Sequence, residues 1–177
     1  MPIGFDINAA DFARLGHDFN RLPAEVKQVV FARAFRRVGT MTRTRVIRHN
    51  AKRIKIPQKH VRKRTSKLQG TGGTRRIRVE SGWISLGELG ARQGARGILT
   101  PGRSQVRSGF MATVGGGHRN AFRRVGAARL PIQKLYGPNP ANDIATSPRV
   151  YEALLQDVMK SHMAKRMLHE LTRILPD

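Results

Sequence analysis

Most side chains of this chain that could bind a ligand or take part in a reaction are cationic. The sequence has 34 Lys and Arg against 11 Asp and Glu, which gives a formal net charge of +23 over 177 residues. No acidic residue occurs between Glu25 and Glu80. Solvated helices ordinarily mix both signs, and like charges repel one another unless anions neutralise them. The composition therefore predicts a polyanionic partner, either nucleic acid or the acidic surface of another protein.

Within this basic block we expect particular side chains to contact DNA or a partner protein. They are Arg33, Arg36, Arg37, Arg43, Arg48, Lys52, Arg53, Lys59, Arg62, Lys63 and Arg64. Residues 51–68 carry the densest charge, and three interpretations compete for them: contact with a DNA backbone, docking onto acidic neighbouring subunits, and a disordered basic tail. Apolar anchors inside the segment weigh against simple disorder; these are Ile54, Ile56, Val61 and Leu68.

Groups for catalysis or cofactor binding show no usable spacing. The six His are scattered, and Asp and Glu are too few and too dispersed for an acid/base pair or a two-metal site. The absence of Cys excludes disulfides and thiol chemistry. The Gly-rich stretch at 69–73 lacks the Gly-Lys-Ser/Thr ending of a phosphate loop. We therefore expect no enzyme, no catalytic residue, no cofactor and no metal site.

The elements that must position the cations can be predicted from periodicity and from capping signals. Apolar residues recur at helical spacing after Leu22-Pro23-Ala24-Glu25, where Pro and Glu favour a helix start. Pro57 is expected to start a short second helix, and Ser147-Pro148 a long terminal one. The expected helices cover 7–21, 22–50, a segment after Pro57, and 148–175; the expected strands cover 74–89, 105–114 and 120–125.

Together these elements predict an α+β fold, with N-terminal helices, one small antiparallel sheet from about 74 to 136, and a long C-terminal helix packed on that sheet. A length of 177 residues suits a single domain, 1–177. We expect this domain to carry a basic helical arm at about 43–68 and a Gly-rich loop at about 90–104. No apolar stretch is long enough to predict a membrane span.

The segment around Arg129-Leu130-Pro131-Ile132 combines apolar alternation with a missing backbone donor at Pro131, which favours a sheet edge. We expect an assembly interface formed by Leu130, Ile132, Leu135, Tyr136 and Tyr151. If Leu130 and Tyr136 are buried, replacing either by Ala would lower the free energy of unfolding by about 2–4 kcal/mol. Asn139-Pro140 and Asn142-Asp143 then favour a turn-rich connector before the terminal helix.

The Arg-Leu-Pro-Ile and Leu-Tyr-Gly-Pro core at 129–138 carries a family resemblance. It is preceded by His118 and by Phe122-Arg123-Arg124, and the terminal helix follows it. In this order of features the chain resembles the minor tail protein Z family, the tail completion proteins of lambda-like siphophages. The resemblance implies a structural virion protein, in the tail or neck, which passes through the host cytoplasm during assembly.

The resemblance also implies partners. They are other tail and neck proteins, namely the tail terminator, the tail tube and the head-tail connector, together with copies of the chain in a homo-oligomeric ring, for which a hexamer is the expected order. Phage DNA in the lumen and acidic neck proteins are both candidates for the basic surface. The alternative from a different class is a free, sequence-independent nucleic-acid-binding protein, associated with the nucleoid or the ribosome.

Overall fold

The computed structural model describes residues 23–70, 74–114 and 117–174. Its described part holds four helices and two small antiparallel sheets of three strands each, which confirms the α+β fold class. The chain forms two compact units. The helical unit comprises residues through Val46, residues 67–77 and the chain from Arg149 onward. The sheet unit comprises Ile47–Ser66 and Arg78–Pro148.

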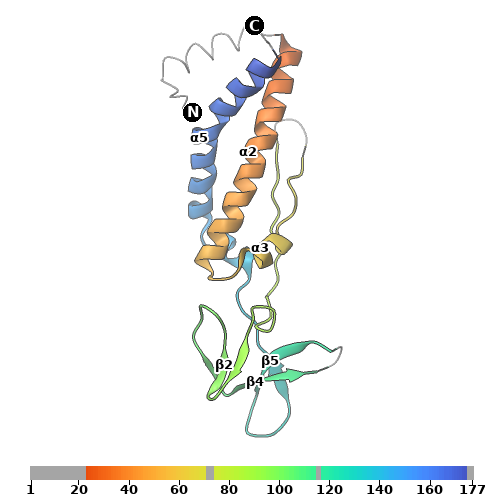
Figure 1. Ribbon diagram of the computed structural model, residues 1–177, viewed down its shortest axis with the longest axis vertical. Helices are drawn as coiled ribbons and strands as arrows, with labels where there is room; N and C mark the ends of the chain where they lie inside the picture. The colour runs from red at the N-terminus through yellow and green to blue at the C-terminus, as the bar shows by residue number, and fades with distance from the viewer. Residues whose placement is uncertain (1–22, 71–73, 115–116, 175–177) are drawn as a thin grey trace, which may run out of the picture. The chain divides into compact units, whose positions relative to one another are not determined.

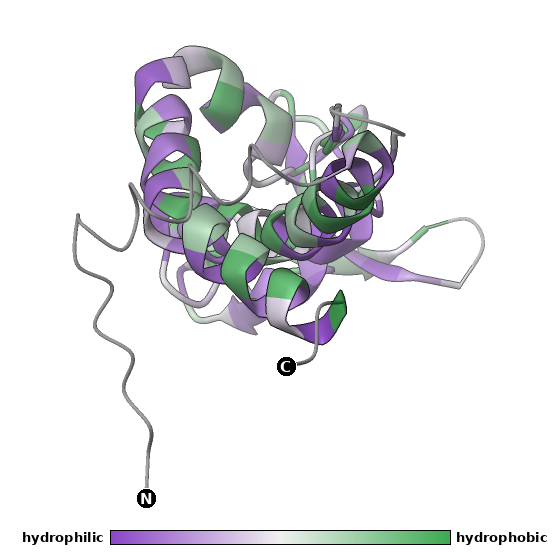
Figure 2. Cartoon of the chain, turned by 90° about the horizontal axis from the view of Figure 1, so that it is seen from above, coloured by the Kyte–Doolittle hydropathy of each residue, from purple (hydrophilic) through white to green (hydrophobic). Residues whose placement is uncertain are grey.

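The helical unit is built from two long helices that run side by side (Figure 1), the first part of α2 (Ala24–Arg53) and α5 (Pro148–Ile174). Val30, Ala34 and Val38 recur every four residues on α2 and are fully buried, as is Val158 of α5, and Tyr151 of α5 is nearly so. The helical ribbons alternate between apolar and polar stretches in Figure 2, as amphipathic helices do. Both predicted long helices are thus confirmed, while the helix expected at 7–21 lies outside the described residues.

The long C-terminal helix differs from expectation in its packing partner. We expected it across the sheet, but α5 forms its compact unit with α2, and both sheets belong to the other unit. Amphipathicity shows that one face of a helix is buried, but it does not show which element covers that face.

Gly39 is a site of close packing on α2. It is buried in α2, and a Cβ at this position would lie 2.8 Å from Cδ2 of Leu68. Leu68 precedes Gln69, which exchanges two backbone hydrogen bonds of 3.0 and 2.8 Å with Arg76. The missing side chain of Gly39 therefore lets this segment approach the helix.

The sheet unit contains a short helix and both sheets. Helix α3 (Gln58–Arg64) begins directly after Pro57, as predicted. The first sheet has the order β1-β2-β3 and the second the order β4-β5-β6, with all neighbours antiparallel. The strands are β1 (Arg92–Gly94), β2 (Gly97–Leu99), β3 (Val106–Arg107), β4 (Gly109–Thr113), β5 (Arg119–Arg124) and β6 (Ile132–Lys134). The expected Gly-rich loop at 90–104 therefore contains the β1-β2 hairpin.

Two expectations about the sheet are wrong. One sheet was expected, but the strand predicted at 105–114 is divided between two sheets, because Ser108 adopts a φ of 60° between β3 and β4. The strand expected at 74–89 belongs to neither sheet and makes only isolated bridges. A turn interrupts its alternation, with backbone hydrogen bonds from Leu89 to Ser85 and from Gly90 to Gly87.

One apolar core joins these elements of the sheet unit. It includes Ile47 and Ala51 of α2, Val61 of α3, Ile98 of β2 and Ala121 of β5. β6 lies at an edge of its sheet and directly follows Pro131, as the missing donor of that proline predicts.

The connector expected before the terminal helix contains a helix of its own, α4 (Pro140–Thr146). Asn139 caps it by accepting a hydrogen bond of 3.1 Å from the amide of Ala141, and Pro140 occupies the first turn. The Asn-Pro pair therefore acts as a helix start rather than as a turn.

Candidate polyanion-binding and assembly surfaces

The predicted cations of the helical unit lie on the solvent side of α2. Arg33, Arg36 and Arg37 are exposed and stand three or four residues apart, so they share one helix face. Val30 and Ala34 of the same helix are buried, so the three arginines belong to the exposed part of its circumference. Arg43 is half-buried and already engaged by a neighbour. The structure thus brings the first three arginines together into one positively charged helix face.

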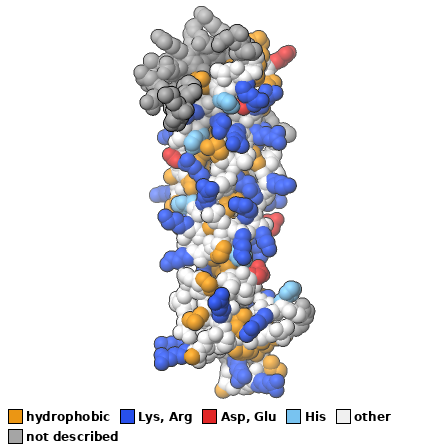
Figure 3. All heavy atoms as spheres, in the orientation of Figure 1, with side chains coloured by type: hydrophobic (Ala, Val, Ile, Leu, Met, Phe, Trp, Pro, Cys, Tyr) orange, Lys and Arg blue, Asp and Glu red, His pale blue; other side chains and the backbone are white. Residues whose placement is uncertain are grey.

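Helix α3 presents a second basic face, in the sheet unit. Lys59, Arg62 and Lys63 are exposed at helical spacing, whereas His60 and Val61 are buried beneath them. The helix has no acidic residue in its first turn and three basic residues in its last. Arg48 and Lys52 are exposed in the last turns of α2. Lys and Arg side chains are spread over the face drawn in Figure 3, where acidic ones are few.

Two of the predicted contact residues are used within the sheet unit. The Arg64 guanidinium packs on Gly82, where a Cβ would collide with it. Arg53 donates from Nε to Oδ2 of Asp143 at 3.1 Å and from Nη2 to Oγ of Ser147 at 2.9 Å. Their charges therefore contribute to the fold of the unit as well as to its surface.

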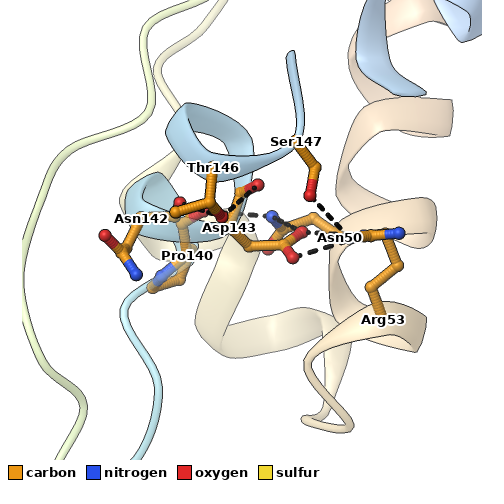
Figure 4. Close-up of polar contacts among 7 residues, drawn as sticks. All are labelled: Asn50, Arg53, Pro140, Asn142, Asp143, Thr146 and Ser147. Atoms are coloured by element: carbon orange, nitrogen blue, oxygen red, sulfur yellow. Dashed lines mark hydrogen bonds and ion pairs between the residues drawn. The ribbon is translucent and has the colours of Figure 1, made fainter. Parts of the chain in front are cut away.

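Arg53 belongs to a polar cluster that ties α4 to the end of α2 (Figure 4). Asn50 is fully buried and donates from Nδ2 to the carbonyl oxygen of Pro140 at 3.0 Å and to Asp143 at 3.3 Å. Asp143 is only 15% exposed at its side chain, so its ion pair with Arg53 is partly desolvated. A partly buried pair is less screened than a surface pair and fixes the geometry of the elements that carry it.

Replacing Asp143 by Ala is expected to lower the free energy of unfolding by about 1–3 kcal/mol, because Asn50 and Arg53 each lose an acceptor in a partly buried place. Urea denaturation measures the change. The control is Asp157→Ala in the helical unit, which removes a more exposed pair with Arg45 and is expected to cost less than about 1 kcal/mol. Equal losses in the two variants would contradict a stabilising role for the cluster.

His60 lies buried next to the exposed face of α3. Burial lowers its pKa from the ordinary value of 6.5, and the neighbouring Lys59 and Lys63 lower it further, while Glu88 raises it. The neutral imidazole is therefore the form that the fold prefers.

Because the folded state holds a lowered His60 pKa, the unfolded chain binds the proton more readily as the pH falls below about 6.5. Stability is expected to be fully present above that pH and to decrease on acidification. His60→Gln should flatten the stability profile between about pH 7 and pH 5, as measured by thermal unfolding. The control for the change of residue type is His118→Gln, at an exposed position.

The predicted assembly residues fall into three environments. Leu130 and Tyr136 are 66% and 53% exposed, so both are free to meet a partner. Ile132 is half-buried, and Leu135 packs partly against the core of the sheet unit. Tyr151 is only 5% exposed and lies within the helical unit. Leu130 and Tyr136 therefore remain candidates for an assembly interface, while Tyr151 is used inside the fold.

The two tyrosines of the chain provide a matched pair. Tyr136→Ala is expected to change the free energy of unfolding by no more than about 0.5 kcal/mol, since the side chain is exposed. Tyr151→Ala should cost about 3 kcal/mol through loss of buried contacts. Urea denaturation of both variants tests this, and a large loss in Tyr136→Ala would show that its ring is a core residue.

Residues that sequence reasoning missed lie on the second sheet and beside it. No acidic residue occurs from 89 to 142, a stretch that contains all six strands. Its cations are Arg92, Arg96, Arg103, Arg107, Arg119, Arg123, Arg124, Arg129 and Lys134. The absence of acidic residues from this stretch could be read from the sequence. The face of the sheet on which each cation lies, and the aromatic rings beside it, depend on strand register and could not.

The described residues contain no group of three or more His, Cys, Asp or Glu side chains suited to hold a metal ion. None of the helices in these parts of the chain is both long and apolar enough to cross a membrane. The fold and its surfaces define a basic α+β protein whose prominent chemical groups are exposed cations.

Comparison with known families places this chain. It belongs to the family described as prophage minor tail protein Z (GPZ), whose model matches residues 17–176. This confirms the resemblance drawn from the segment at 129–138 and gives the chain a structural role in a phage tail, in association with other tail proteins. No curated protein and no solved structure matches the chain.

Proposed function

We propose that the chain is a tail completion protein, which forms a homo-oligomeric ring at the head-proximal end of the tail and stabilises the head-tail junction. The whole chain would serve as one tail-completion domain in the virion, after assembly in the host cytoplasm. Its neighbours would be the tail terminator, the tail tube and the head-tail connector, and a hexamer is the expected ring.

The observation that carries this proposal is the pair of exposed one-sign helix faces on a folded protein of the tail family. Arg33, Arg36 and Arg37 on α2 form one face, and Lys59, Arg62 and Lys63 on α3 form the other. Several copies of such faces around one lumen would repel one another unless an anion occupied the lumen or acidic subunits covered them. Packaged or exiting DNA and acidic neck proteins both provide that neutralisation.

The two basic faces are proposed to do different work. The face around Arg36 would turn toward the lumen, and the arm at 43–68 would touch neighbouring subunits or DNA. Arg48 and Lys52 would support that arm, since both are exposed. Leu130, exposed in the loop before β6, would supply apolar contact with the next subunit.

Deletion of the gene from its phage tests this role. Heads and tails are expected to accumulate without joining, and purified full-length chain added to the lysate should restore infectious particles. Gold labelling of the restored particles should mark the head-proximal end of the tail. A normal yield of joined particles without the chain would overturn the proposal, as would labelling only at the distal tip. Absence of the chain from purified virions would favour a free nucleic-acid-binding protein.

A further inference from the structure

The sheet formed by β4, β5 and β6 has two unlike faces. Its inner face carries Met111, Ala121 and Leu135, which belong to or pack against the core of the sheet unit. The register pairs Phe110 with Phe122 and Phe122 with Lys134. Because side chains alternate along a strand, these residues project from the opposite face. We call this the outer sheet face; it comprises Phe110, Phe122, Arg124, Ile132, Lys134 and Tyr136.

The outer sheet face combines aromatic rings with cations. Cζ of Arg124 lies 5.8 Å from the ring centroid of Phe110, and Nζ of Lys134 lies 5.5 Å from that of Tyr136. Phe110 also packs against Phe122, with ring centroids 6.2 Å apart. At these distances the cations are attracted to the ring faces, which holds them in place. The face therefore presents positive charge directly beside aromatic rings.

Trp83 extends this surface. Ser85 forms a bridge with Tyr136, so the alternation of extended residues places Trp83 on the same side as Tyr136. Trp83 is 60% exposed and Tyr136 is 53% exposed. Exposed Trp, Tyr and Arg side chains are the types that dominate the binding energy of protein interfaces.

The chemistry of this surface selects its partner. It lies within the acid-free stretch from 89 to 142, apart from Trp83, so the same surface on a second copy would oppose it with like charge and supply no carboxylate. Duplex DNA would match the charge, but its outer surface is phosphate and its apolar groups lie inside the grooves, away from a flat surface that carries Trp83. Single-stranded nucleic acid stacks successive bases on a row of open rings, whereas here Phe122 is buried and a cation lies over one face of Phe110 and of Tyr136, which leaves Trp83 and the other face of Tyr136. An acidic protein segment with an apolar residue matches both the cations and the exposed aromatic rings of this surface.

We propose that the outer sheet face, with Trp83 at its end, is the docking site for an acidic segment of a neighbouring tail protein. This inference rests on the proposed role in the tail and adds the site and the chemistry of the partner to it. Arg124 and Lys134 would meet carboxylates of the segment, while Trp83 and Tyr136 would cover its apolar side chain. The site is separate from the basic faces of α2 and α3.

Tails purified from the deletion phage, which lack this chain, provide the probe. Cosedimentation of the full-length chain with these tails, at one fixed ionic strength, measures affinity. Trp83→Ala and Tyr136→Ala are each expected to weaken binding by about 10- to 100-fold. Arg124→Glu should weaken it at least as much. The matched control is Arg123→Glu, which makes the same change in net charge one residue earlier, on the opposite face of β5, and should retain the affinity of the wild type.

The outcomes separate this inference from the proposed function. If the wild-type chain binds tails and all three outer-face variants bind equally well, the docking site is wrong while the role in the tail stands. Equal losses in Arg124→Glu and Arg123→Glu would show an effect of net charge alone and would also overturn the site. Failure of the wild type to bind any tail would overturn both proposals. A change in self-association or in DNA affinity, with tail binding intact, would assign the face to another partner.

Discussion

Replacing Lys59, Arg62 and Lys63 together by Glu is expected to lower the affinity for duplex DNA by about 500-fold near 0.1 M salt. Three phosphate contacts contribute about 2.7 to the slope of log affinity against log salt, and hence about 2.7 decades of affinity at that concentration. The three side chains are exposed on one face of α3, so the fold should remain intact. Fluorescence anisotropy with a labelled duplex measures the affinity, and urea denaturation checks the fold. The yield of infectious particles should fall clearly, while the free energy of unfolding of the purified variant should stay close to that of the wild type.

The control for this triple variant reverses three other exposed cations, Arg92, Arg96 and Arg107, and so produces the same net charge. The two triple variants should therefore differ in DNA affinity only if DNA contacts the face of α3 itself. Equal loss of DNA affinity in both would show that net charge, and not the face of α3, governs binding. Arg64 is left unchanged although it directly follows these residues in the sequence, because its guanidinium packs on Gly82 and its reversal would disturb the fold.

The helices were predictable because their signals are local and repeated. α2 and α5 each carry several turns of apolar periodicity and begin at a proline signal, so their limits agree with the structure to within a few residues. α3 follows Pro57 for the same reason. The short strands have no comparable signal, since β1 and β2 are three residues long and contain glycine. The strands are divided into two sheets between β3 and β4, where Ser108 adopts a positive φ that the sequence does not indicate.

The candidate contacts were predictable by residue type but not by environment. Arg62 and Arg53 look equivalent in the sequence, yet only Arg53 meets a carboxylate, that of Asp143, ninety residues later in the chain. Tyr136 and Tyr151 both follow apolar patterns, and long-range packing alone decides that one is exposed and the other buried. The outer sheet face was missed because it depends on the register of three strands. Such pairings cannot be obtained from local periodicity.

Binding of the full-length chain to duplex DNA is expected to weaken roughly a thousandfold between about 50 and 200 mM salt if six phosphates are neutralised. Exposed cations available for such contacts include Arg33, Arg36 and Arg37 on α2 and Lys59, Arg62 and Lys63 on α3. The slope of log affinity against log salt should be about −5.4, because each neutralised phosphate contributes about −0.9.

Two unrelated duplexes of equal length distinguish the partners in this titration. Phosphate contacts carry no sequence information, so both duplexes should bind with the same affinity and the same slope. Docking onto acidic tail proteins is also sensitive to salt, but it depends on the arrangement of carboxylates and is selective for those proteins. A shallow slope with DNA, together with tight and selective binding to tails lacking the chain, would therefore assign the basic faces to protein neighbours. A steep slope shared by both duplexes would instead assign the basic faces to DNA, because phosphates are the same in every duplex and each contact adds to the slope.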